Sequence, residues 1–115
     1  MTAMTTRNQA AIDPEHGRRE SVLKALASER RLQILDWLKA PAEHFPAQEH
    51  GDHATHGACN LFIVDKLGVS QPAGSRHLKV LVDAGLVIAS KRKGWTYYRR
   101  NEDRIAEVLR DLATI

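Results

Sequence analysis

The first quarter of the chain changes from a polar stretch to apolar residues at helical spacing. Residues 1–15 hold few large apolar side chains, and this composition predicts a disordered arm. From Arg18 onward, Val22, Leu23 and Leu26 recur at the spacing of one helix face. We therefore predict that the first helix begins near Arg18.

A second helix is predicted over residues 29–38, and a long polar connection follows it. Ser28 offers a side-chain oxygen as an N-cap, and Pro41 lies just beyond the last predicted turn. The connection, residues 40–59, is much longer than the roughly 2–8 residues that usually join packed helices. We expect a segment of this length to be either functional or mobile.

The third predicted helix is short and ends in a tight turn. Residues 60–67 have the helical pattern, with Leu61, Val64 and Leu67 on the face expected to meet the core. Residues 68–70 then form the turn. This spacing predicts a helix-turn-helix unit whose second helix follows directly.

The fourth predicted helix has a clear start and end. Ser70 is a suitable N-cap, and Pro72 falls in the first turn, where its missing N–H is not needed. The helix is expected to run to about Ala84 and to stop at Gly85, the residue type that favours the left-handed C′ position.

The periodicity changes after the fourth helix. Residues 86–90 and 95–99 are β-branched or aromatic runs, and the basic residues 91–94 between them predict the tip of a hairpin. Asn101 is an N-cap for a last helix over residues 102–112.

The predicted element order is helix, helix, helix, turn, helix, hairpin, helix, which is a winged helix-turn-helix arrangement. The fold class is mainly α (α+β), with five helices and a two-stranded β-hairpin wing. A chain of 115 residues suits one domain, which we place at residues 16–115 with residues 40–59 as an inserted loop.

The charge is concentrated in the predicted DNA-reading unit. Residues 70–100 contain seven basic side chains and one acidic side chain, a net charge of +6. The whole chain carries +3, so the remainder sums to −3. A localised basic face indicates a polyanionic partner, here double-stranded DNA. The single cysteine permits no internal disulfide, and no signal peptide or apolar run of about 20 residues is seen, so we expect a cytoplasmic protein without a membrane partner.

The fourth helix has a polar face suited to reading DNA. Arg76 can pair bidentately with guanine and Gln71 with adenine, since the N-terminal half of a recognition helix leads into the major groove. The hydroxyls and Lys79 are better placed for phosphates, and the wing cations for the backbone or minor groove. His77 is expected to be structural or to contact phosphate. The candidate DNA-contacting residues are Ser70, Gln71, Pro72, Ala73, Ser75, Arg76, His77, Lys79, Arg92 and Lys93.

Several motifs in this chain resemble the ArsR/SmtB family of bacterial winged-helix repressors. They are LGVSQP at residues 67–72, SRHLKVL at 75–81, AGLV at 84–87 and GWTYYR at 94–99, with ALASERRLQIL at 25–35 upstream. The resemblance implies a homodimer formed by the first and last helices, binding to a palindromic operator and release by an inducer. Gly74 departs from the family, which places a small β-branched or apolar residue there, and close helix approach is one explanation.

The last helix carries an apolar stripe larger than a small domain needs on a terminal helix. Together with the family resemblance, this stripe predicts a two-fold dimer. The candidate interface residues are Val22, Leu26, Ile105, Val108, Leu109 and Leu112.

Neither of the family's usual metal sites is intact. The resemblance places its Cys-x-Cys motif on residues 59–61, where only Cys59 is a cysteine, and the last helix has no histidine. The chain instead has His50, His53, His56 and Cys59 at spacings of three, a donor set that suits a divalent transition metal such as nickel or zinc. Two other interpretations remain open: a His-rich polar loop with a buried cysteine, and thiol or other sensing.

Two further functional classes were weighed against a DNA-binding regulator. A non-regulatory metal-binding or protein-interaction module could reuse the winged-helix fold, but the retained Gln71, Arg76 and Lys79 argue against it. An enzyme is disfavoured because no nucleophile–base pairing, Gly-rich phosphate loop or paired carboxylates are found.

Overall fold

The computed structural model describes residues 14–48 and 50–115, with side chains described from Arg18 onward apart from residue 49. Thirteen residues of the predicted arm, 1–13, lie outside this description, and the first described helix begins four residues before Arg18. The elements, in chain order, are α2 (Pro14–Leu26), α3 (Glu29–Trp37), α4 (Pro41–His44), β1 (Ala58–Cys59), α5 (Asn60–Leu67), α6 (Gln71–Asp83), β2 (Val87–Arg92), β3 (Trp95–Arg100) and α7 (Glu102–Leu112).

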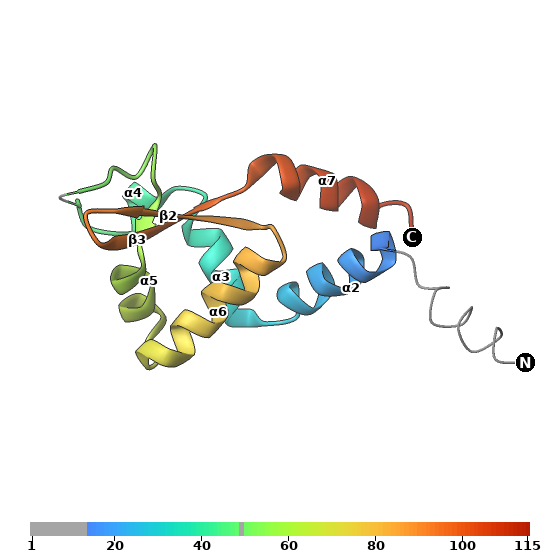
Figure 1. Ribbon diagram of the computed structural model, residues 1–115, viewed down its shortest axis with the longest axis horizontal. Coiled ribbons are helices and arrows are strands. Elements are labelled where there is room, and N and C mark those ends of the chain that lie inside the picture. Colours follow the sequence, from blue (N-terminus) through green and yellow to red (C-terminus); the bar gives the residue numbers. More distant parts are fainter. Residues whose placement is uncertain (1–13, 49) are drawn as a thin grey trace, which may run out of the picture.

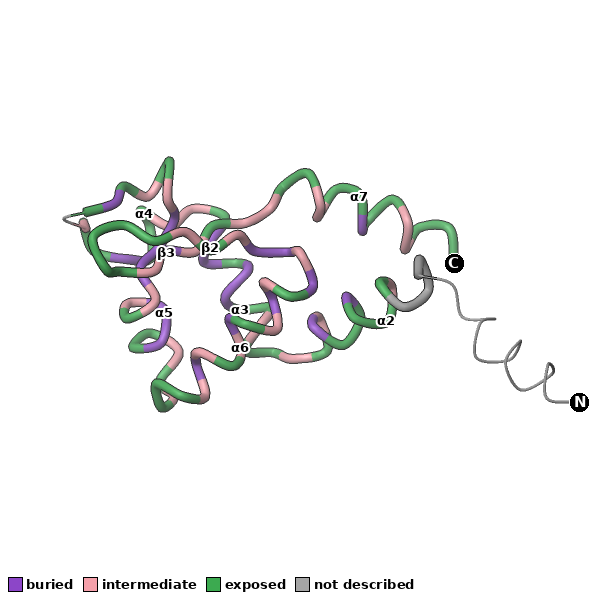
Figure 2. The backbone as a smooth tube through the Cα atoms, viewed as in Figure 1, coloured by how far each residue is buried: buried purple, intermediate pink, exposed green. Residues whose placement is uncertain are grey.

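Two long helices extend from a packed body (Figure 1). The body holds α3, α5, α6 and the sheet, whereas α2 and α7 project together from one side. The largest fully buried side chains all lie in the body, and Figure 2 shows most of α7 exposed or half-buried. These fully buried residues are Ile34, Ile63, Leu78, Leu81 and Leu86.

The predicted wing is present, but it belongs to a three-stranded antiparallel sheet with the order β1-β3-β2. The hairpin pairs Val87 with Arg100 at its base and Arg92 with Trp95 at its tip. On the other edge of β3, Ala58 pairs with Tyr98 and Cys59 with Tyr97. The end of the inserted loop is therefore a strand of the wing sheet, which the sequence analysis did not predict.

The inserted loop also contains a short helix. Pro41 does not simply stop the preceding helix, since it occupies the first turn of α4, where its missing N–H is not needed. The described part of the chain therefore has six helices, one more than the five that the sequence predicted.

The orientation of α5 differs from the prediction. Ile63 and Val64 are buried, whereas Leu61, which we expected to face the core, is 43% exposed. The helix packs against α6 and β3 through the side that carries Ile63 and Val64, so Leu61 in its first turn points away from that contact.

Close helix approach explains Gly74. A Cβ built at this position would lie 2.5 Å from Cγ2 of Val64 on α5, well inside van der Waals contact. Because Val64 is itself buried, it has little room to move. The glycine thus sets how closely the two helices of the helix-turn-helix unit pack.

We expect Gly74→Ala to destabilise the fold by about 1 kcal/mol. Overpacking costs about 1–3 kcal/mol and is only partly offset by the roughly 0.5–1 kcal/mol that alanine gains inside a helix. Urea unfolding measures the change. In a Val64→Ala background the clash is removed, so Gly74→Ala should be neutral or stabilising there, and an equal cost in both backgrounds would contradict this explanation.

Candidate DNA-binding surface

The start of the recognition helix α6 is fixed by a side-chain cap and by the tight turn before it. Its N-cap Ser70 accepts a hydrogen bond from the backbone N–H of Ala73, at 3.3 Å, through its side-chain oxygen. The preceding helix α5 ends at Gly68, which has the left-handed φ of 71°. This turn places the start of α6 at the surface, where it can lead into a groove.

The two faces of α6 separate as predicted. Gly74, Leu78 and Leu81 are buried against the body. The opposite face is accessible: Gln71, Pro72, Arg76 and Lys79 are exposed, and Ala73 and Ser75 are half-buried.

Two polar contacts lie along the accessible face. Gln71 Nε2 donates to Ser75 Oγ at 3.5 Å, and Lys79 Nζ lies 2.9 Å from Asp83 Oδ2. Both partners of the ion pair are well exposed, so the pair is weak and a DNA phosphate can replace Asp83.

The wing tip is a tight turn with both central residues in the left-handed region, Lys93 at φ 52° and Gly94 at φ 83°. Arg92 and Lys93 are exposed there, as the DNA-contact prediction requires. Arg92 Nε also donates to the backbone oxygen of His50 at 3.5 Å, so the inserted loop lies against the wing.

Arg100, a basic residue of the segment 70–100, is held by neighbouring groups. The side chain of Arg100 forms an ion pair with Glu102 at 2.7 Å and donates to the backbone oxygen of Leu35. This arginine, first through its hydrogen bond and then through its charge, lowers the pKa of Glu102. Arg100 therefore anchors the base of the wing to α3 and α7.

His77 lies on the inner flank of α6, away from the exposed face. Its Nδ1 is 3.1 Å from a guanidinium nitrogen of Arg31 on α3. Burial, followed by the positive charges of Arg31, Arg30 and Arg76, lowers the pKa of His77. Since a guanidinium can only donate, a neutral imidazole accepts through Nδ1. This contact suits a positioning role for His77.

The same arginine also binds the end of α2. Arg31 Nε donates to the backbone oxygen of Ala25 at 2.7 Å, and Nη2 donates to that of Lys24 at 2.9 Å. One side chain thus connects α2, α3 and the recognition helix. Sequence reasoning missed Arg31, because its histidine partner is 46 residues away.

The predicted dimer residues differ in how far the single chain buries them. Val22 and Val108 are buried within the single chain, and Leu26, Ile105 and Leu112 are half-buried. Leu109 is 61% exposed, and Leu23, which we did not assign to the interface, is 42% exposed. An exposed leucine on each projecting helix is the feature that a partner chain would cover.

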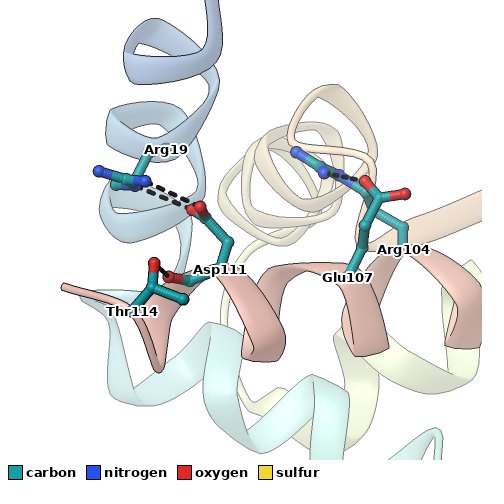
Figure 3. A network of polar contacts seen from close by, with 5 residues as sticks. All are labelled: Arg19, Arg104, Glu107, Asp111 and Thr114. Atoms are coloured by element: carbon teal, nitrogen blue, oxygen red, sulfur yellow. Dashed lines mark hydrogen bonds and ion pairs between the residues drawn. The ribbon is translucent and has the colours of Figure 1, made fainter.

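Two ion pairs lie along α7, and one of them joins it to α2 (Figure 3). Arg19 of α2 forms two hydrogen bonds to the Asp111 carboxylate, both 2.8 Å long. Arg104 contacts Glu107 at 2.6 Å within α7. The Arg19–Asp111 pair ties α7 to α2 and so limits the angle between the two helices, which sets the shape of the surface they offer.

The four predicted metal ligands do not converge. His50 is exposed, while His56 Nδ1 accepts a hydrogen bond from the backbone N–H of Asp52. The Nε2 of His53 is buried without a hydrogen-bond partner, and Cys59 is buried on β1. Within residues 18–48 and 50–115, whose side chains are described, no three His, Cys, Asp or Glu side chains are grouped as a metal ion requires. In this conformation these residues do not fit a metal.

We expect the lowered pKa of His77 to appear in the pH dependence of stability. In the unfolded chain His77 has its ordinary pKa of about 6.5, whereas in the folded chain its lowered pKa means that it binds a proton only at lower pH. The free energy of unfolding should therefore fall as pH drops below about 6.5. Urea unfolding at about pH 7.5 and 5.5 tests this, with His77→Gln as the reference, because glutamine keeps an acceptor but does not titrate. Identical pH dependence in the two proteins would contradict the lowered pKa.

Comparison with known proteins agrees with this geometry. Residues 62–89, which cover most of α5, the turn, α6 and the start of β2, match the model of bacterial regulatory proteins of the arsR family. The chain is 44% identical over 93 residues to the uncharacterized HTH-type transcriptional regulator YbzH of Bacillus subtilis, covering 81% of this chain and 93% of that protein. It is 28% identical to the arsenical resistance operon repressor of the same organism, covering 78% and 72%.

A solved structure shows the same architecture. The homodimeric winged helix-turn-helix DNA-binding domain from Mycobacterium bovis superposes with a TM-score of 0.57 at 31% identity, covering 85% of this chain and 80% of that one. In the described ranges, none of the helices has the length and apolar composition that a membrane span needs. The relatives are transcriptional regulators and not enzymes. The fold, the exposed face of α6 and the relatives agree that this chain belongs to the ArsR family of winged helix-turn-helix transcriptional regulators.

Proposed function

We propose that the chain is a transcriptional repressor that binds a palindromic operator as a homodimer. The observation that carries the proposal is the division of α6 into a buried face and an exposed one that presents Gln71, Arg76 and Lys79. Repression is supported by the 28% identical arsenical resistance operon repressor. Dimerisation is supported by the M. bovis domain, which is homodimeric.

The projecting helices give the dimer its physical basis. Leu23 on α2 and Leu109 on α7 are exposed large apolar side chains, and covering them removes apolar surface from water. Contact between the two copies of this surface creates a two-fold axis. Two recognition helices related by that axis read two half-sites in opposite directions, so the operator is palindromic.

We do not include metal responsiveness in the proposed function, because the side chains do not lie close enough together to bind a metal. They are those of His50, His53, His56 and Cys59. Metal binding by these residues stays a prediction. Titration calorimetry with zinc and nickel on the wild type and on a triple alanine variant of the three histidines tests it. A weaker affinity in the variant would support the prediction, and equal affinity would overturn it.

We expect Arg76→Ala to weaken operator binding by about 1–3 kcal/mol and to relax the preference at one base per half-site. Fluorescence anisotropy on a duplex enriched from random-sequence DNA measures both effects. Lys39→Ala is the matched control, since Lys39 is an exposed cation outside α6 and the wing. Unchanged affinity and preference in Arg76→Ala would show that α6 does not read the bases.

We expect Lys93→Ala to act through charge alone. Removing one phosphate contact weakens binding to all sequences about equally and lowers the slope of log K against log salt by about 0.9. The same titration, repeated at several salt concentrations, gives the slope. An unchanged slope would remove the wing tip from the DNA interface.

We expect Leu109→Glu to give monomers, because it places a charge where the two α7 helices would meet. Sedimentation velocity at micromolar concentration measures the mass. Leu32→Glu is the control, since Leu32 is also an exposed leucine, at 38%, but lies on α3. A monomeric wild type, with and without DNA, would contradict the dimer.

A further inference from the structure

A cavity of about 210 Å³ lies between the inserted loop, the start of α5 and the wing. Tyr97 and Cys59 are buried in its wall, while Leu61 and Trp95 on its lining are 43% and 42% exposed. Phe62 adds a third aromatic ring. Two of the exposed large apolar side chains on the described surface therefore border one cavity.

The wall formed by the loop is fixed by hydrogen bonds. Gln48 Oε1 accepts from the backbone N–H of Cys59 at 2.6 Å, and Gln48 Nε2 donates to the backbone oxygens of Gly51 and Gly57. Tyr97 is also held, because its ring lies against Gly51, where a Cβ would come within 3.0 Å of it. The cavity is thus preformed and does not need an opening motion.

The lining chemistry limits the occupant. The described residues that line the cavity include no Lys, Arg, Asp or Glu, so none of them offers an ionic ligand a carboxylate, an ammonium or a guanidinium group. Apolar cavities of about 150 Å³ hold benzene, whereas sites for drug-sized molecules are about 300–1,000 Å³. The volume and the aromatic walls favour an uncharged molecule with a single aromatic ring, stacked or edge-on against Trp95.

The cavity borders the wing directly and α6 only by way of α5. Trp95 pairs with Arg92 across the wing tip, and Arg92 contacts the inserted loop at His50. Leu61 and Phe62 lie in the first turn of α5, whose other end leads through the turn into α6. A molecule bound there would contact the wing through Trp95 and α5 through Leu61 and Phe62.

We propose that this cavity is a binding site for a small uncharged aromatic molecule, and that its occupancy changes operator affinity. The second part rests on the proposed function, whereas the first does not. Allosteric coupling of ordinary strength corresponds to a change of about 5–150-fold in affinity.

Binding is tested with benzyl alcohol as the probe and Cys59 as the reporter. Cys59 is the only cysteine of the chain, so its alkylation by iodoacetamide, followed by mass spectrometry, reports on this wall alone. We expect benzyl alcohol to slow alkylation saturably, and benzoate, which has the same ring with a charge, to have little effect. No saturable protection, or equal protection by benzoate, would overturn the site.

A second reporter checks the location. The chain has two tryptophans, so Trp37→Phe leaves Trp95 as the source of fluorescence excited at about 295 nm. Benzyl alcohol should change this fluorescence with the same Kd as it protects the wild-type Cys59. The thiol assay needs no substitution, so the test stands if Trp37→Phe, which alters a core residue, folds poorly.

Matched variants test the cavity itself. Ala47 lines it and is exposed, so Ala47→Phe should fill it and weaken benzyl alcohol binding at least about tenfold. Ala54→Phe places the same ring on an exposed part of the loop outside the lining and should leave binding unchanged. Equal affinity in both variants would contradict the assignment.

The effect on DNA is measured last, by anisotropy on the enriched duplex with and without benzyl alcohol. A change in operator affinity that Ala47→Phe abolishes would support regulation through the cavity. Benzyl alcohol binding without any change in operator affinity would overturn regulation and leave the site. Absence of sequence-specific DNA binding by the protein alone would instead count against the proposed function.

Discussion

The guanidinium of Arg31 holds together the three helices on which DNA reading depends. It donates to two carbonyls at the end of α2, at Ala25 and Lys24, and to Nδ1 of His77 on α6. These carbonyls belong to the last turn of α2, where backbone acceptors lack the i+4 partner of the helix interior. Because all three bonds come from one planar group, the projecting helix and the recognition helix cannot move independently without breaking one of them. The contact requires a neutral His77, and its lowered pKa is consistent with this requirement.

The inserted loop is built into the DNA-reading unit. Its end forms β1 on the edge of the wing, and Gly57, with φ of +87°, passes so close to β3 that a Cβ would overlap the backbone oxygen of Tyr98. Gln48 then ties the rest of the loop to this strand. The histidines that suggested a metal site thus lie on a segment whose backbone is held by other bonds, and their side chains point to different surroundings.

The sequence predicted the elements whose signals are local. The caps at Ser28, Ser70 and Asn101 each accept the expected backbone hydrogen bond, because capping depends on residues only three positions apart. It missed β1, which is two residues long and pairs with a strand far along the chain. It also placed Leu61 in the core, because the apolar pattern of a short helix is compatible with more than one orientation.

The candidate site could also be predicted only in part. The exposed face of α6 follows from helical periodicity, so the exposure of Arg76 and Lys79 could be predicted from the sequence. The role of His77 could not, since it depends on a distant arginine. The cavity beside Trp95 was equally hidden, because its walls come from the loop, α5 and β3.

Hydroxyl-radical footprinting on the enriched duplex tests whether two copies of α6 read DNA about a two-fold axis. We expect two symmetric protected regions on one face of the duplex, with centres about one helical turn, or a whole number of turns, apart. A single protected region without a symmetric counterpart would contradict the two-fold arrangement. Protection that does not depend on sequence would contradict base reading by α6.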